Sequence, residues 1–273
     1  MIIQFTKMHG AGNDFVMADD RAGKLDVTPG LARRILDRRF GVGADQLLVI
    51  RNTDEADFEM RIYNPDGSEV EMCGNGVRCA AIYAKSRGIV KKDNMSVKTL
   101  AGIIRPAIVG DLVRVDMGIP EFDGPKIPVD LDGEVLDHPI EVGGREFSIN
   151  CVSMGNPHCV IYTDDVENAP VESVGPMIER HALFPKRVNV EFITVLSRNE
   201  IKMRVWERGT GETLACGTGA TAAAVVSARK GLTGREVTVH LRGGDLRINW
   251  LESGRVAMTG PAVEVYRGEI NID

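Results

Sequence analysis

Two cysteines stand at the start of nearly identical short sequences. Cys73 begins Cys-Gly-Asn-Gly and Cys216 begins Cys-Gly-Thr-Gly, and an alanine-rich stretch that predicts a helix follows each of them. Glycines allow the backbone to turn sharply, and the first N–H groups of a helix are unpaired and carry partial positive charge. We therefore expect the pKa of each thiol to lie below its usual value of about 8.5. The same N–H groups can bind a carboxylate.

Two such thiols are suited to proton transfer at one carbon atom. One thiolate removes the proton next to a carboxylate, and the second thiol delivers a proton to the opposite face, which inverts the stereocentre. Without pyridoxal, the helix-end N–H groups must stabilise the charge of the carbanion. Cys73 and Cys216 are thus predicted to be the acid and base of an amino-acid epimerase that needs no cofactor.

The two cysteine motifs belong to a longer internal repeat. A shift of 143 residues, the separation of Cys73 and Cys216, aligns segments over most of the chain. The aligned segments include Met60–Asn64 with Met203–Glu207, Gly12-Asn13 with Gly155-Asn156, Gln46 with Asn189, and Gly88 with Gly231. Such a register indicates two homologous halves. A pseudo-twofold relation between them would turn both helix starts toward one cleft, where the active site is expected.

The other three cysteines have no such counterpart. Cys79 aligns with Ala222, so we predict that Cys79 is a core residue. Cys151 and Cys159 flank the turn at Gly155-Asn156, and neither aligns with a cysteine.

Each half has the pattern of an α+β fold. Short alternating or apolar runs predict strands, which outnumber the helices and favour a mostly antiparallel sheet. Helices are predicted at about Pro29 to Arg39, at Val174 to Ala182, and after each cysteine as far as Gly88 and Gly231. The predicted domains are residues 1–118, completed by a C-terminal strand at 263–273, and residues 119–262.

The composition argues against several classes of protein. The chain has 273 residues, of which 43% are hydrophobic and 26% charged, and its net charge is −6. This charge argues against a nucleic-acid surface, and no apolar stretch reaches the roughly 20 residues that span a bilayer. Five cysteines without a Cys-x-x-Cys pair argue against a zinc site. No signal peptide is visible at the N-terminus, so the expected location is the cytoplasm.

Further motifs resemble those of the diaminopimelate epimerase family. They are Gly12-Asn13-Asp14-Phe15, Gly43-Ala44-Asp45-Gln46, Asn64-Pro65-Asp66-Gly67-Ser68, Gly155-Asn156-Pro157-His158, Arg187-Val188-Asn189 and the stretch Glu207–Thr213 before Cys216. The resemblance implies interconversion of L,L- and meso-diaminopimelate, without pyridoxal phosphate or metal, in lysine and peptidoglycan synthesis. It also implies a homodimer whose protomers have two domains, each a curled sheet around a central helix.

The resemblance assigns a role to particular residues. Cys73 and Cys216 correspond to the catalytic cysteines, and His158 and Glu207 match positions that tune the two thiols. The backbone amides of Gly74, Asn75, Gly217 and Thr218 would hold the reacting carboxylate. The substrate-binding side chains would be Asn13, Gln46, Asn64, Asn156, Asn189, Glu207 and Arg208. A substrate with two ammonium and two carboxylate groups needs both acceptors and a forked cation such as Arg208.

Three other functions remain open at this point. Proline and hydroxyproline racemases also use two cysteines on a similar duplicated fold. They have His after the first Cys-Gly and Asp in the second motif, where this chain has Asn75 and Glu212. The non-enzymatic alternatives are a catalytically inactive amino-acid-binding protein and a thiol redox sensor. Deuterium uptake from solvent at the substrate Cα would distinguish an epimerase from both of these.

Overall fold

The computed structural model describes residues 1–272 of the chain. The chain divides into two compact units, of which the first comprises residues 1–116 and the segment from Gly260 onward. The second unit comprises Met117–Thr259. Among the described residues, no helix is both long and apolar enough to cross a membrane.

The first unit is built on an eight-stranded sheet. Its elements are β1 (Ile2–Gly10), β2 (Asn13–Asp19), α1 (Pro29–Leu36), β3 (Gln46–Arg51), β4 (Phe58–Tyr63), β5 (Glu69–Val70), α2 (Gly74–Ser86), β6 (Val97–Thr99), β7 (Gly102–Ile104), β8 (Ala107–Val109), β9 (Leu112–Asp116) and β19 (Val263–Asn271). The strand order is β19-β1-β2-β3-β4-β6-β7, and β5 pairs with β4. Most neighbours are antiparallel, while β3 runs parallel to β2 and β6 parallel to β4.

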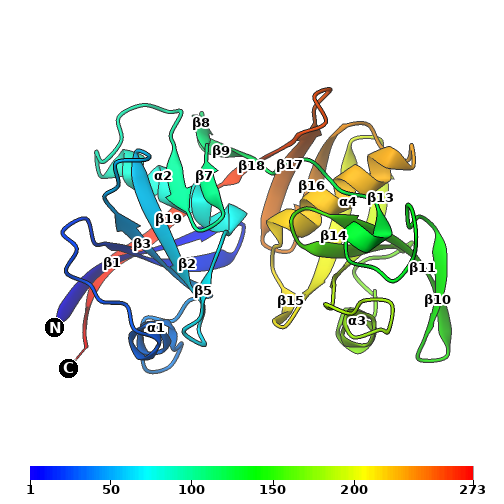
Figure 1. Ribbon diagram of the computed structural model, residues 1–273, viewed down its shortest axis with the longest axis horizontal. Helices are drawn as coiled ribbons and strands as arrows, with labels where there is room; N and C mark the ends of the chain where they lie inside the picture. The colour runs from blue at the N-terminus through cyan, green and yellow to red at the C-terminus, as the bar shows by residue number, and fades with distance from the viewer. Residues whose placement is uncertain (273) are drawn as a thin grey trace. The chain divides into compact units, whose positions relative to one another are not determined.

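The two helices of this unit cover opposite faces of its sheet. Leu47 and Val49 pack in one apolar cluster with Ile35 of α1, whereas Leu48 lies beneath Gly76 of α2. Because successive strand residues point to opposite faces, α1 and α2 must lie on different sides of β3. Helix α2 also contacts β1, β2 and β19, and Figure 1 shows it among these strands.

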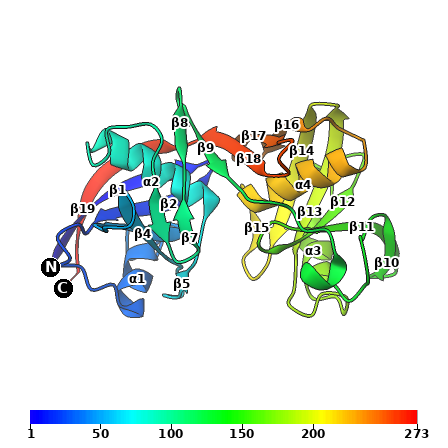
Figure 2. The same ribbon diagram turned by 45° about the horizontal axis from the view of Figure 1, so that its top comes forward.

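The second unit repeats this arrangement. Its elements are a 3-10 turn at Gly124–Lys126, β10 (His138–Val142), β11 (Arg145–Ser153), β12 (Pro157–Tyr162), α3 (Val171–Glu179), β13 (Asn189–Ser197), β14 (Glu200–Glu207), β15 (Gly211–Thr213), α4 (Gly217–Arg229), β16 (Glu236–Leu241), β17 (Gly244–Trp250) and most of β18 (Val256–Pro261). Helix α4 contacts β11, β12, β13, β14, β16 and β17, as the orange ribbon in Figures 1 and 2 shows. Helix α3 packs on β13 and β14.

The repeat in the sequence is a repeat of three-dimensional structure. The order β1-β2-β3-β4-β6-β7 in the first unit matches β11-β12-β13-β14-β16-β17 in the second. The registers match as well, since Phe15 pairs with Gln46 in the parallel pair β2–β3 and His158 pairs with Asn189 in β12–β13. Helices α2 and α4 both have 13 residues and are related by the same shift of 143. Strand β19 lies beside β1 as β10 lies beside β11.

The predicted ends of the outer helices were wrong by a few residues. Helix α1 ends at Leu36 rather than near Arg39, because Asp37 adopts an extended conformation and its carboxylate accepts the N–H groups of Arg39 and Phe40. Helix α3 runs from Val171 to Glu179 rather than from Val174 to Ala182.

The predicted ends of α2 and α4 are confirmed. Gly88 and Gly231 follow the last helical residues with φ of 66° and 73°, which glycine adopts without strain.

Candidate active site

Each catalytic candidate is the N-cap residue of the central helix of its unit. Cys73 and Cys216 both have extended backbones, and the first helical hydrogen bonds run to their carbonyl oxygens from Val77 and Ala220 at 2.9 Å. The N–H groups of the two Gly-x-Gly turns therefore form the first turn of each helix. The predicted helix starts after Cys73 and Cys216 are confirmed in both units.

The second glycine of each turn is required by packing. A Cβ on Gly76 would lie 3.2 Å from Leu48 Cδ1, and a Cβ on Gly219 would lie 2.7 Å from Glu191 Oε1. The helix start thus sits directly on the sheet, above Leu48 in one unit and above Glu191 in the other. A larger residue would push the first turn, and the cysteine with it, away from the sheet.

In the first unit the Cys73 thiol faces an oriented amide. Its Sγ lies 3.8 Å from Asn13 Oδ1, which also accepts from Asn75 Nδ2 at 3.2 Å. Asn13 Nδ2 donates to Asp45 Oδ2 at 2.8 Å. The fully buried Arg78 donates to Asn75 Oδ1 at 2.8 Å. Both predicted asparagines are therefore held by charged neighbours.

Asp45 is itself part of an ion-pair cluster. Arg38 bridges Asp14 and Asp45 at 2.8 and 2.7 Å, and Lys7 contacts Asp14 at 2.7 Å. Burial alone would raise the pKa of Asp14, but the hydrogen bonds from Arg38 and Lys7 outweigh it and lower this pKa to about 2. Asp14 is consequently a carboxylate at neutral pH.

The remaining predicted pair of the first unit is also in contact. Gln46 Nε2 donates to Asn64 Oδ1 at 2.9 Å, and Asn64 Nδ2 donates to Ser68 Oγ at 3.2 Å. The buried Gln46 Oε1 has no hydrogen-bond partner within residues 1–272. This oxygen is an acceptor that an ammonium group can use.

In the second unit the Cys216 thiol lies among acidic side chains. The N–H of Gly219 donates to its Sγ at 3.3 Å, and Thr218 Oγ1 lies 3.5 Å from it. Burial raises the pKa of Cys216 well above its ordinary value, and the charges of Glu207 and Glu191 raise it further. The prediction of a lowered pKa was wrong for this thiol, because burial and two carboxylates outweigh the helix end.

Glu207 forms a hydrogen-bonded pair with this thiol. Burial raises the pKa of Glu207, against the lowering effect of its hydrogen bonds with Thr213 and Cys216. Burial therefore favours the uncharged forms of both groups.

His158 is completely buried on β12. Its Nδ1 lies 2.7 Å from Glu191 Oε1, and its Nε2 lies 3.0 Å from Asn156 Oδ1. Asn156 Nδ2 in turn donates to Thr218 Oγ1 at 3.4 Å. The predicted residues His158, Asn156 and Thr218 therefore form one chain of contacts that reaches Cys216.

The segment that carries Arg208 is fixed by internal hydrogen bonds. The N–H of Arg208 donates to Asn189 Oδ1 at 2.9 Å, and the guanidinium donates to Lys186 O at 3.1 Å. Glu179, at the end of α3, accepts from Trp206 Nε1 at 2.8 Å and from the N–H of Gly209 at 3.0 Å. Residues 206–209 are thus tied to both α3 and β13.

Four contacting residues were not singled out from the sequence. Asp45 holds Asn13, Glu191 holds His158, Thr213 contacts Glu207, and Glu179 holds the segment of Arg208. The only visible signal for Glu191 is a charge within an apolar strand, at the position that aligns with Leu48.

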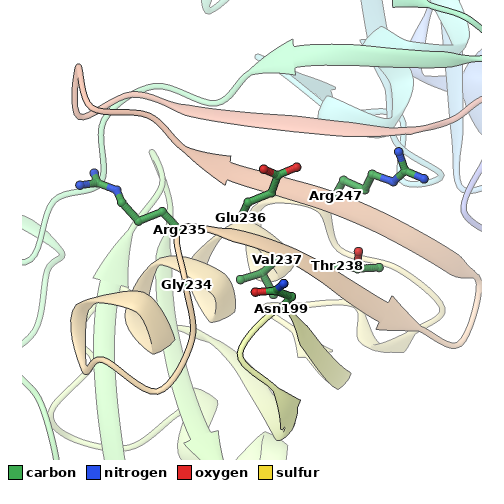
Figure 3. Close-up of a pocket in the computed structure, with 7 residues that line it drawn as sticks. All are labelled: Asn199, Gly234, Arg235, Glu236, Val237, Thr238 and Arg247. Carbon is green, nitrogen blue, oxygen red and sulfur yellow. The ribbon is translucent and has the colours of Figure 1, made fainter.

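Two other features lie outside this network. Cys79 is fully buried in the core, as predicted, and Cys151 and Cys159 are fully buried as well. A hollow lined by Asn199, Gly234, Arg235, Glu236, Val237, Thr238 and Arg247 contains none of the predicted site residues (Figure 3). Within residues 1–272, no group of three or more His, Cys, Asp or Glu side chains is arranged to hold a metal ion.

Solved structures of other proteins resemble this fold. A phenazine biosynthesis protein from Bacillus anthracis covers 100% of both chains with a TM-score of 0.73 and 19% identity. A probable proline racemase from Agrobacterium radiobacter covers 99% of this chain and 93% of its own with a TM-score of 0.72 and 17% identity. At these identities the likeness establishes the fold.

Proteins that are similar in sequence identify the family of the chain more closely than the solved structures do. The diaminopimelate epimerase of Moorella thermoacetica is 54% identical over 279 residues, which cover 99% of this chain and 100% of that one. The diaminopimelate epimerase of Pelotomaculum thermopropionicum is 53% identical and covers 98% of both chains. The sequence model of diaminopimelate epimerase matches residues 5–122 and 150–265. The chain belongs to the diaminopimelate epimerase family.

Proposed function

We propose that this chain interconverts L,L- and meso-diaminopimelate, with Cys73 and Cys216 as the two proton-transfer groups. The observation that carries the proposal is the placement of a cysteine at the N-cap of each central helix, at equivalent positions of two repeated units. Full-length relatives at about half identity carry the same activity in their names.

The proposed reaction uses no group from outside the protein. One sulfur, as thiolate, takes the Cα proton, and the electron pair of the broken C–H bond moves into the adjacent carboxylate. The N–H groups of Gly74, Asn75, Gly217 and Thr218 stabilise this enediolate-like charge. The other thiol then donates its proton to the opposite face of the carbon, which forms the new C–H bond and inverts the centre.

Glu207 is proposed to act on the Cys216 thiol. The two groups are hydrogen-bonded, and burial raises the pKa of both. Transfer of the thiol proton toward Glu207 would produce the thiolate only when a bound substrate displaces water and offers a proton in return. His158 is proposed to influence the thiols through Asn156 and Thr218, to which it is connected by hydrogen bonds.

The second amino-acid end of the substrate is assigned to the polar side chains of both units. Arg208 would pair with the distal carboxylate. The unpartnered oxygen of Gln46 would accept from an ammonium group, and the side chains of Asn13, Asn64, Asn156 and Asn189 would complete the polar lining. Arg208→Ala should therefore weaken substrate binding without unfolding the protein, and an unchanged affinity would remove its role as a clamp.

We further propose that the two compact units are homologous domains and that the protein is a cytoplasmic homodimer. Strand β19 is at the edge of its sheet and exposes Val263, Val265 and Tyr266. An edge strand with exposed apolar side chains is suited to pairing with another chain. Light scattering after size-exclusion chromatography tests this, and a monomer at micromolar concentration would refute it.

Isotope uptake tests the activity directly. The reduced protein is incubated with L,L-diaminopimelate in deuterated water, and both meso product and deuterium at Cα are measured. Proline and hydroxyproline serve as comparison substrates. We expect deuterium in diaminopimelate alone. Deuterium in proline or hydroxyproline instead would indicate a racemase, and no deuterium in any of the three would leave only the binding or redox functions.

A further inference from the structure

The buried pair His158–Glu191 has no polar counterpart in the first unit. Both side chains are completely buried, and their contact is 2.7 Å. Under the repeat, His158 corresponds to Phe15 and Glu191 to Leu48, and the strand registers of the two units agree. Phe15 and Leu48 are also completely buried. The same place in the fold therefore holds an apolar pair in one unit and an acid–base pair in the other.

The first unit shows that this place does not need polar groups to fold. Burying a charge costs free energy unless it is paired, and well-packed apolar side chains often replace a buried ion pair without loss of stability. Glu191 lies beneath the N-terminal turn of α4, where a negative charge is favoured. Its Oε2 nevertheless has no hydrogen-bond partner within the described part of the chain. Because the fold does not require the buried His158–Glu191 pair, we infer that the pair has a functional role.

The hydrogen-bond geometry fixes the orientation of the ring. Glu191 Oε1 and Asn156 Oδ1 face the two ring nitrogens of His158 at 2.7 and 3.0 Å. A carboxylate oxygen accepts, so Nδ1 is the ring nitrogen that donates to Glu191, and this contact fixes the orientation of the ring toward Asn156. The Asn156 carbonyl then points to His158, and its NH₂ group points to Thr218.

We infer that Glu191 is a positioning residue for the proton-transfer site of the second unit. Its carboxylate keeps a proton on His158 Nδ1, His158 orients the Asn156 amide, and the amide directs its NH₂ group to Thr218 beside Cys216. The consequence for catalysis depends on the proposed function, whereas the protonation of the ring does not. In the first unit Phe15 and Leu48 occupy the two places, and the aligned Asn13 is oriented by Asp45 without a histidine between them, so the two thiols are tuned differently.

Three variants test the role of Glu191, and the internal repeat suggests the design of one of them. Glu191→Gln keeps the shape and removes the charge. The double variant with His158→Phe and Glu191→Leu reproduces the Phe15–Leu48 pair and should fold. The exposed pair His240–Glu200, with 3.7 Å between its charged atoms, supplies the matched control Glu200→Gln on the same sheet.

The first measurement is nitrogen NMR of the histidine rings at pH 7. The His158 signals are identified by their absence in the double variant. We expect a proton held on His158 Nδ1 in the wild type and in Glu200→Gln, and a changed distribution of the proton between the two ring nitrogens in Glu191→Gln. Unchanged His158 signals in Glu191→Gln would overturn the inference, whether or not the protein is an epimerase.

The second measurement is the steady-state kinetics of diaminopimelate epimerisation. Glu191→Gln should lower kcat by about tenfold or more while KM changes by less than about threefold, because second-sphere partners act through the group they orient. Changed ring signals with an unchanged kcat would overturn the positioning role. An inactive wild type would refute the proposed function, and the NMR result would still decide the state of the pair.

Discussion

The side-chain amide of Asn13 donates to the carboxylate of Asp45 at 2.8 Å, and this contact determines which end of the amide faces Cys73. Because a carboxylate accepts only, the NH₂ group must point to Asp45 and the carbonyl oxygen to the thiol. In the second unit the equivalent Asn156 directs its oxygen to His158 and its NH₂ group to Thr218. Two aligned asparagines thus have differently anchored amides.

Asp45→Asn should therefore impair catalysis more than folding. An asparagine at this place can present an NH₂ group to Asn13 and allow its amide to rotate away from Cys73. A hydrogen bond to a charged group contributes about 1.5–3 kcal/mol, so we expect kcat/KM to fall by about tenfold or more. The control is Asp111→Asn in the exposed turn between β8 and β9. Equal kinetics for the two variants would show that Asp45 does not orient Asn13.

The three cysteines near or in the central helices should respond differently to alanine. Cys73→Ala and Cys216→Ala each remove one proton-transfer group and should abolish epimerisation. Cys79 is fully buried, burial raises its pKa to about 12, and its aligned residue in the second unit is Ala222. Cys79→Ala should keep substantial activity. Product formation and thermal unfolding are measured together, and equal loss of activity in all three would contradict the assignment.

The sequence was most informative where a local rule decides the structure. The Cys-Gly-x-Gly turns and the terminal glycines at 88 and 231 predicted α2 and α4 almost to the residue, because caps depend on neighbours in the chain. The repeat predicted two units of equal strand order. The start of α3 was missed because it begins after Pro170 without a side-chain cap.

Properties that depend on distant residues could not be predicted. The raised pKa of Cys216 comes from burial and from Glu207 and Glu191, which approach the thiol only in the folded sheet. Asp45 lies in a motif that was recognised, but its contact with Asn13 follows from the pairing of β2 with β3. The spacing of residues in a sequence does not contain these distances.

Glu179→Gln should loosen the segment that carries Arg208. The carboxylate accepts from both Trp206 and the N–H of Gly209 and is almost fully buried. A glutamine has one acceptor oxygen, so one of these two contacts is lost. We expect KM for diaminopimelate to rise several-fold, since the distal clamp is less well placed, with a smaller change in kcat. Glu172→Gln, exposed in the first turn of the same helix, is the control.

One outcome for Glu179→Gln would contradict its role in placing Arg208. A lowered unfolding temperature with an unchanged KM would mean that Glu179 only stabilises the packing of α3 on β14. A Gly175→Ala variant gives a second test of that packing, because its Cβ would lie 2.7 Å from the Trp206 side chain. It should destabilise the unit by about 1–3 kcal/mol.

Acid should weaken the first unit through Asp14. The ion pairs with Arg38 and Lys7 lower the pKa of Asp14 from 3.8 to about 2, against the effect of burial. A depressed pKa contributes stability that is fully present above pH 3.8 and is lost as the pH falls toward 2. This difference corresponds to at most about 2 kcal/mol. Urea unfolding at pH 6 and pH 3 should show a smaller loss of stability in Asp14→Asn than in the wild type or in Asp111→Asn. An identical loss in all three proteins would mean that the acid sensitivity arises from other carboxylates and that the cluster at Asp14 contributes nothing to it.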